Sequence, residues 1–423
     1  MSTTASRSLV VWRDDERIGE LREAGNLWSF AYDPGWRNSP AAFALSPSLP
    51  LQEAPIEDGG SQRPVQWFFD NLLPEDSERT LLARDAGVDT ADAFGLLQRY
   101  GPESAGALTL LAPGEVLPAG GLVPLSDQEL SRRIRELPRV ALSHDAPKRM
   151  SMAGAQHKLA VVLAGDQLFE PQGATASTHI LKPDHPHTDH YAHSAINEWF
   201  VMRLAAAVGL DVPAITLRRV PQPVYLIERF DREGYAAAAR RRHVLDACQL
   251  LSLDRRYKYE QATAATLRHL AELCRARAAT RQAIFRWSVF NLLIGNGDAH
   301  LKNLSFFLSH QGIRLAPHYD LLSTGVYREA AWLNAELVTP MGHAHRFGEI
   351  RRTHVQAFGN ALGIPLPASE RLLDDVLAKV KHYAAVLLEH CQHDAAMAIL
   401  PGEARLLRAI VYGPINDLSR QLQ

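Results

Sequence analysis

NLLIGNGDAHLKNL, residues 291–304, and HYDLL, residues 318–322, are the two segments on which the fold assignment depends. The first places Asp298 and Asn303 in the spacing D-x-x-x-x-N, and the second contributes Asp320. Phosphoryl transfer from a nucleotide uses this set: one carboxylate accepts the proton of the attacking hydroxyl, while a carboxamide and a second carboxylate hold magnesium against the phosphates. Apolar runs at 304–308 and 312–315 predict a hairpin that brings Asp320 back beside the other two. The pattern therefore predicts a site for ATP and Mg²⁺.

The composition is that of an ordinary globular protein. A chain of 423 residues with 46% hydrophobic and 22% charged residues is long enough for two or three domains. A formal net charge of −2 provides no general attraction for nucleic acid or an anionic membrane, so any DNA contact must come from local patches or from a partner. Three widely separated cysteines argue against a disulfide framework. No signal-peptide core or membrane-length apolar run occurs, and we expect a cytoplasmic protein.

The order of predicted elements divides the chain into three parts, 1–140, 141–242 and 243–423. The first mixes strands at Leu9–Trp12 and Leu27–Tyr32 with a helix near 65–74. The second is mainly strands, interrupted by a helix from Ser194, expected as its N-cap, to Val208. The third is largely helical, with a buried helix at 283–295. Expected strands of the second part are 158–163, 178–182, 215–220 and 224–230. This order predicts an α+β, bilobal protein-kinase-like fold, with a β-rich small lobe, an all-helical large lobe and an N-terminal α/β subdomain.

Lys182 ends one of the predicted small-lobe strands. In a bilobal kinase such a lysine pairs with the α- and β-phosphates and is held by a glutamate on the neighbouring helix. Glu198, on the helix that begins near Ser194, is the candidate for that partner. The alternative interpretation is a surface lysine at a strand end and a solvated glutamate.

Two further segments are candidates for contacts with a nucleotide. Ser151–Lys158, SMAGAQHK, has small residues that would let backbone N–H groups approach phosphate oxygens, although a plain turn before a strand explains it too. Glu228 and Phe230 lie where a kinase offers main-chain atoms to adenine. The alternative there is that Glu228, Arg229 and Asp231 form ordinary surface ion pairs.

Other patterns in the sequence say less about function. The histidine-rich run 179–193 matches no zinc-binding spacing and is interpreted as a solvated loop rather than a metal site. Basic clusters at 240–242 and 255–258 are interpreted as solvated faces. A hydrolase is set aside because no G-x-S-x-G turn occurs.

Taken in order, the motifs resemble the HipA family, the serine/threonine kinase toxins of type II toxin–antitoxin systems. The matching segments are FDNLLPE at 69–75, YGPESAGALTLL at 100–111, SMAGAQHK at 151–158, THILK at 178–182, LIERFDR at 226–232, CQ at 248–249, KYE at 258–260, LIGNGDAHLKN at 293–303 and YDLLS at 319–323. The resemblance spans nearly the whole chain.

The resemblance implies a function and partners. Family members phosphorylate a protein substrate, in known cases an aminoacyl-tRNA synthetase, which stalls tRNA charging and causes growth arrest or persistence. A helix-turn-helix antitoxin binds the toxin, and the complex represses its own operon, so operator DNA would be reached mainly through the antitoxin. No membrane is involved.

The resemblance also implies roles for residues. Asp298 would be the catalytic base, and Asn303 and Asp320 the magnesium ligands. Ser151 would be the autophosphorylation site, and its phosphate, of about −1.5 to −2 charges, would be repelled by those of the nucleotide and drive the loop out of the pocket. The implied ATP-binding residues are Ala153, Gly154, Ala155, Gln156, Lys182, Glu228, Phe230, Lys302, Asn303 and Asp320.

Two positions depart from the family pattern: His157 stands where an acidic residue is usual, and Pro183 where an apolar one is usual. Two alternatives from other classes stay open. One is a small-molecule phosphotransferase of the aminoglycoside-kinase type, and the other is a catalytically silent corepressor module.

Overall fold

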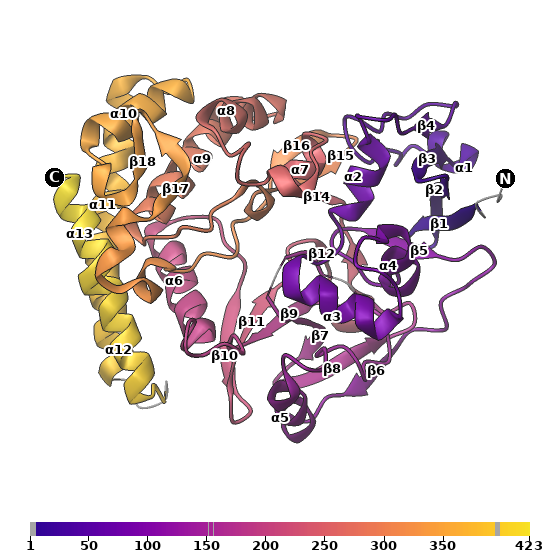
Figure 1. Cartoon of the computed structure of the whole chain (residues 1–423), viewed down its shortest axis with the longest axis horizontal. Helices are drawn as coiled ribbons and strands as arrows, with labels where there is room; N and C mark the ends of the chain where they lie inside the picture. Colours follow the sequence, from indigo (N-terminus) through magenta and orange to yellow (C-terminus); the bar gives the residue numbers. More distant parts are fainter. Residues whose placement is uncertain (1–5, 151, 155, 394–397) are drawn as a thin grey trace. The chain divides into compact units, whose positions relative to one another are not determined.

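The computed structural model describes residues 6–150, 152–154, 156–393 and 398–423. The chain forms two compact units (Figure 1). The first comprises residues 1–183, 219–257 and 305–313, and the second comprises 184–218, 258–304 and 314–423.

An antiparallel sheet with the strand order β4-β3-β2-β1-β5 begins the first unit. Its strands are β1 (Arg7–Arg13), β2 (Glu16–Ala24), β3 (Leu27–Tyr32), β4 (Ile56–Glu57) and β5 (Leu108–Leu111). The helices of this part are α1 (Pro34–Arg37), α2 (Pro64–Asp70), α3 (Asp76–Ala86) and α4 (Ala93–Tyr100). In β3 buried and partly exposed residues alternate, as expected for a strand with one face on the core. The predicted strands at 9–12 and 27–32 are confirmed.

A second sheet of the first unit has the order β11-β9-β7-β8-β6. It consists of β6 (Gly121–Pro124), β7 (Leu159–Ala164), β8 (Gln167–Gln172), β9 (His179–Pro183) and β11 (Pro223–Glu228), with α5 at Asp127–Glu136. Its core is formed by buried aliphatic side chains from β7, β8, β9 and β11 and by Leu130 of α5. β10 (Ile215–Arg219) leads the chain back into this unit. The strands predicted between 158 and 230 are thus present, each within about two residues of its expected end.

Short elements complete the first unit. They are β12 (Arg232–Glu233), β13 (Arg240–Arg241), β14 (Val244–Asp246), α7 (Ala247–Leu250) and β15 (Ser305–Ser309), which turns into β16 (Gly312–Leu315). The hairpin predicted over 304–315 is therefore confirmed, and β14 is an additional strand that the sequence pattern did not predict.

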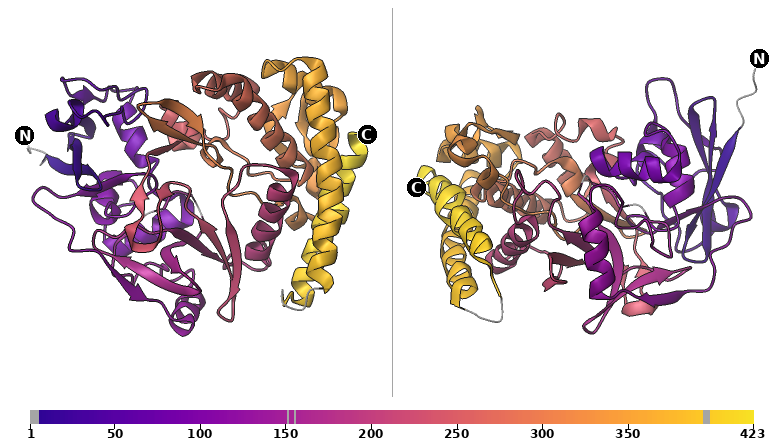
Figure 2. Two further views of the ribbon diagram at one scale, coloured as in Figure 1. Left: turned by 180° about the vertical axis from the view of Figure 1, so that it is seen from behind. Right: turned by 60° about the horizontal axis from the view of Figure 1, so that its bottom comes forward.

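The second unit is mainly helical. Its helices are α6 (Ser194–Val208), α8 (Ala264–Leu273), α9 (Arg277–Leu293), α10 (Arg352–Ala361), α11 (Leu366–His393), α12 (Pro401–Ile410) and α13 (Asn416–Gln421). α11 packs against α6 and α9, and in Figure 2 it runs beside α12 and α13. The hairpin β17 (Glu336–Met341) and β18 (Ala344–Arg346) was not predicted. No helix in the described ranges combines the length and apolar character needed to cross a bilayer.

Candidate active site

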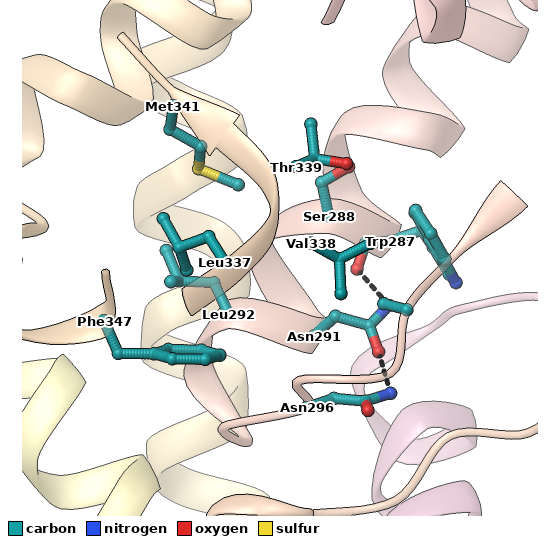
Figure 3. Close-up of a pocket in the computed structure, with 11 residues that line it drawn as sticks. Trp287, Ser288, Asn291, Leu292, Asn296, Leu337, Val338, Thr339, Met341 and Phe347 are labelled. Carbon is teal, nitrogen blue, oxygen red and sulfur yellow. Dashed lines mark hydrogen bonds between the residues drawn. The ribbon is translucent and has the colours of Figure 1, made fainter. Parts of the chain in front are cut away.

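The segment that carries Asp298 follows the buried helix α9 through a turn at Gly295. Gly295 has φ +66°, and a Cβ there would lie 2.9 Å from Cβ of Pro414, so glycine is required by both conformation and space. Beyond the turn, Asn296 donates a hydrogen bond to Oδ1 of Asn291 at 2.7 Å, and Asn291 donates to the carbonyl of Trp287 at 2.9 Å (Figure 3). These bonds fix the loop to the helix from which it emerges.

Asp298 is held on three sides within the second unit. Its N–H donates to Oδ1 of Asn296 at 2.9 Å, and its carbonyl accepts from Nδ2 of Asn303 at 2.9 Å. The hydroxyl of Tyr259 donates to Oδ1 of Asp298 at 2.5 Å. Asp298 is half-buried, and these bonds orient its carboxylate.

The Asp320 segment lies alongside this loop. The hydroxyl of Tyr319 donates to the carbonyl of Lys302 at 2.7 Å, and Oγ1 of Thr324 accepts from the N–H of Gly297 at 2.7 Å. Asp320 itself has φ +59°, a left-handed conformation that costs free energy in a non-glycine residue and is concentrated at functional sites. The residues on either side of Asp320 are therefore bonded to the segment that contains Asp298 and Asn303.

The oxygen donors of Asn303 and Asp320 suit a hard cation such as Mg²⁺, which takes one or two protein ligands and completes its shell with phosphate oxygens and water. A site of this kind needs no dense acidic cluster. Across the ranges that the structure describes, no three or more His, Cys, Asp or Glu side chains gather to hold a metal, and this includes the described histidines of 179–193.

Two histidines pack near the loop. His318 is buried and stacks on Trp287 with ring centroids 6.1 Å apart, and burial lowers its pKa to about 4. It is therefore neutral at pH 7. The ring of His300 contacts the ring of Tyr259 edge-on at 5.0 Å, which supports the tyrosine that holds Asp298.

A small cavity lies behind the loop, between α9, Ala299 and β17 (Figure 3). Its wall is largely apolar, with Leu292, Leu337, Val338, Met341 and Phe347 beside the two asparagines described above. Its volume of about 30 Å³ has room for one or two water molecules, far less than a nucleotide needs.

Glu198 also belongs to the second unit, where it is buried on α6. The bounds of this helix are as predicted, and Gly209 ends it in the left-handed conformation. Ser194, however, is not its N-cap. It is the first helical residue, and its hydroxyl accepts a bond from the N–H of His185 at 2.7 Å, while Asp184 caps the N–H of Ala195 at 2.9 Å.

The remaining candidate residues belong to the first unit. Lys182 is buried on β9, opposite Tyr225 of β11, with its ammonium 5.9 Å from the centre of that ring. Glu228 is exposed at the end of β11, and the ring of Phe230 contacts Phe307 edge-on at 6.0 Å. Ala153, Gly154 and Gln156 precede β7, whereas Ser151 and Ala155 lie outside the described residues.

Arg229 and Asp231 do not form surface ion pairs, which was the alternative interpretation of this segment. Arg229 and Asp231 are buried and bonded to each other at 2.6 Å. Arg229 also donates to the carbonyl of Ser104 at 3.0 Å, and Asp231 accepts from the N–H of Gly106 at 2.7 Å. The motif at 100–111 therefore holds the segment that was expected to contact adenine.

Glu103 is the centre of these contacts and is fully buried. It accepts bonds from Lys148, Arg229, Arg232 and Arg241 at 2.8 to 3.3 Å and from the hydroxyl of Ser177 at 2.7 Å. Burial by itself would raise the pKa of Glu103, but the four cations outweigh it and hold that pKa well below its usual value. We call Glu103, Asp231 and these four cations the buried ion cluster.

Glu103 and Tyr259 lie in segments that carry the family resemblance, but the sequence pattern predicted no role for either residue. A glutamate inside the apolar run 100–111 and a tyrosine between two charged residues at 258–260 were the available signals.

Comparison with known proteins identifies the family to which the chain is similar. Residues 9–111 match the family described as HipA N-terminal domain, and residues 150–384 match the HipA-like C-terminal domain. The serine/threonine-protein kinase toxin HipA of Shewanella oneidensis is 32% identical over 386 residues, 86% of each chain. The Sinorhizobium fredii protein Y4mE is 36% identical over 398 residues, 90% of this chain and 92% of its own.

A solved structure is similar over nearly the whole fold. It is the complex of Shewanella oneidensis HipA and HipB with operator DNA, and the match has a TM-score of 0.79 at 27% identity. The alignment covers 97% of this chain and 99% of that one. The expected α+β, kinase-like architecture with an N-terminal subdomain is confirmed at this level.

Proposed function

The chain belongs to the HipA family of serine/threonine-protein kinase toxins, and from this we propose that it is an ATP- and Mg²⁺-dependent protein kinase that acts as the toxin of a type II toxin–antitoxin system. The observation that carries the proposal is the support of Asp298. Its backbone is bonded to two asparagines and its carboxylate to Tyr259, on a loop bonded in turn to the Asp320 segment.

The proposed roles follow from the chemistry of these groups. Asp298 accepts the proton of the substrate hydroxyl as that oxygen attacks phosphorus. Asn303 and Asp320 hold Mg²⁺, which neutralises charge on the phosphates when it is bound. Lys302 belongs to the same ATP-binding loop.

Lys182, in the first unit, pairs with the α- and β-phosphates, and Glu198, in the second unit, is proposed as the residue that orients it. Glu228 and Phe230 offer main-chain atoms to adenine, and the segment Ala153–Gln156 covers the phosphates. The buried ion cluster supports this assignment, because it fixes the chain directly after Phe230 and at Lys148, just before the phosphate-covering segment.

For the substrate and the partners, the proposal follows the family. The substrate is a protein, an aminoacyl-tRNA synthetase, whose phosphorylation stops growth. A helix-turn-helix antitoxin neutralises the kinase and carries it to operator DNA. The complex that Shewanella oneidensis HipA forms with HipB and operator DNA supports this assembly. Ser151 is proposed as the autophosphorylation site that inactivates the enzyme.

The direct test is Asp298→Gln in purified protein incubated with labelled ATP. A general base contributes roughly 10²- to 10⁴-fold, so phosphotransfer should fall by that factor while ATP binding stays near wild type, because the base acts in the transition state. Full self-labelling or full toxicity of this variant would contradict the role of Asp298. Absence of self-labelling in the wild type would favour the small-molecule phosphotransferase or the corepressor alternative.

The autophosphorylation site has its own test. Ser151→Ala should abolish self-inactivation, so that the variant keeps phosphorylating its substrate when the wild type has stopped. Mapping of the phosphate to another residue by mass spectrometry would contradict the assignment. Phosphoproteomics after brief induction, with Asp298→Gln as the control, would identify the substrate.

A further inference from the structure

The phosphate-covering segment meets a part of the first unit to which no role has been given. Pro74 and Gly154 form a parallel β-bridge, and the N–H of Glu75 donates to the carbonyl of Gly154 at 3.2 Å. Pro74 and Glu75 end the motif FDNLLPE at 69–75, directly before α3. The motif thus touches the backbone of the segment at its one glycine.

A second contact with the phosphate-covering segment comes from α3. Glu78, in the first turn of α3, bonds through Oε2 to Nδ1 of His157. Both side chains are buried, with exposed fractions of 6% and 5%. Removing either partner of such a buried polar pair destabilises the folded protein, because the other partner is left without its hydrogen bond.

The pair also limits which side chain can stand at position 157. An acidic side chain at 157 would place a second carboxylate against the buried carboxylate of Glu78, and like charges at such a site repel. In this chain a histidine meets the glutamate instead. The histidine at position 157 is therefore matched to a partner 79 positions away.

The other end of the segment is fixed as well. Lys148 donates to Glu103 at 2.8 Å within the buried ion cluster. The segment between Lys148 and His157 is thus held at both flanks by buried pairs, each formed with a glutamate of the N-terminal part. A binding loop held close to its bound conformation loses less entropy when its ligand arrives.

We infer that Glu78 is a positioning residue for the nucleotide: through His157, and with the Pro74–Gly154 bridge, it holds the phosphate-covering segment in the place where it binds ATP. The inference rests on the proposed role of Ala153–Gln156. It assigns to the N-terminal part a direct effect on ATP affinity and no effect on the chemical step.

The experiment uses the full-length chain and four changes at the pair. Glu78→Ala breaks it, and Glu78→Gln keeps a hydrogen bond to His157. His157→Glu sets a carboxylate against Glu78, and the double change Glu78→His with His157→Glu reverses the pair. Arg7→Gln is the matched control, since it removes a side chain bonded to Asp92 and Glu23 elsewhere in the same N-terminal part.

Loss of one buried polar contact should raise Kd and KM for ATP about tenfold in Glu78→Ala and His157→Glu, with kcat at saturating ATP within about twofold of wild type. Glu78→Gln and the reversed pair should recover most of the affinity. The nucleotide-free protein gives an independent measurement, because amide hydrogen exchange in a peptide covering 152–158 should be faster in Glu78→Ala than in wild type and unchanged in Arg7→Gln.

Unchanged ATP affinity and unchanged exchange in Glu78→Ala would overturn the inference, as would a loss of kcat with KM unaltered. If Glu78→Ala does not fold, the inference is tested by comparing His157→Glu with the reversed pair. The inference is wrong if the reversed pair does not recover the ATP affinity that His157→Glu loses. A wild type that binds ATP but transfers no phosphate would refute the proposed function and leave the comparison of affinities valid. A wild type that does not bind ATP would overturn both the proposed function and the inference.

Discussion

Glu103→Gln should destabilise the first unit more than any exposed substitution in it. The change keeps the shape of the side chain and removes the charge that faces Lys148, Arg229, Arg232 and Arg241. Removing one partner of a buried ion pair costs about 3–5 kcal/mol, because an uncompensated charge stays in the interior. For a unit of this size that loss corresponds to a fall in Tm of roughly 6–20 °C.

The pH dependence gives this prediction a second signature. Because the pKa of Glu103 is lowered on folding, its stabilisation is present above the pKa of an unfolded glutamate, about 4.3, and is lost as the pH falls through the folded value. Asp231 has the same sign: burial alone would raise its pKa, but Arg229 and Arg232 lower it to about 2. The difference in free energy of unfolding between wild type and Glu103→Gln should therefore be largest near pH 7 and decrease as the pH falls below about 4.

The assay is thermal unfolding followed by circular dichroism from pH 3 to 8. The matched control is Glu136→Gln, which removes a carboxylate from the exposed pair with Arg132 and should cost less than about 1 kcal/mol. Two results would refute the reasoning. One is a loss in Glu103→Gln no larger than in the control, and the other is a difference from wild type that does not change with pH.

Two further predictions concern the site. Gly154→Ala puts a side chain at φ +104°, and its Cβ would lie 2.7 Å from Nζ of Lys158. Backbone strain of about 1–3 kcal/mol in this segment should raise KM for ATP roughly tenfold. An unchanged KM would contradict the role of this residue. Tyr259→Phe keeps the ring against His300 but removes the hydroxyl that orients Asp298, so kcat should fall about tenfold while KM for ATP and Tm are kept. An unchanged kcat, or a fall in kcat that comes only with a fall in Tm, would contradict the positioning role.

Local signals in the sequence predicted the elements well. The bounds of α6 follow from its apolar positions and from Gly209, and both ends agree with the structure. Its cap was predicted wrongly because the carboxylate that accepts from the first turn, Asp184, lies 11 positions before its partner. The strands β14, β17 and β18 were missed because each is short or sits among residues that favour helices. Such errors arise wherever tertiary contacts replace local ones.

The candidate catalytic residues were assigned from a short motif, in which Asp298 and Asn303 lie five positions apart on one loop, and the structure bonds the side chain of Asn303 to the carbonyl of Asp298. The residues that support the nucleotide-binding segments could not be predicted, since no short-range pattern links Glu78 with His157, or Glu103 with Arg229. These partners are 79 and 126 positions apart. What the sequence did contain was two charged residues, Glu103 and Lys148, whose side chains become buried.

Buried charges are costly unless they are paired, so a chain that keeps several of them must place their partners accurately. One buried pair of the first unit, Arg133 with Glu170, joins α5 to β8. Three others lie beside two segments, Glu228–Phe230 and the one that precedes β7. Both are segments to which a nucleotide-binding role was assigned on other grounds. Apolar packing would stabilise the same sheets without fixing a loop in one position, whereas hydrogen-bonded ion pairs act only over a narrow range of distance and direction. The pairs beside these two segments therefore agree with the proposal that the N-terminal part positions the segments that bind ATP.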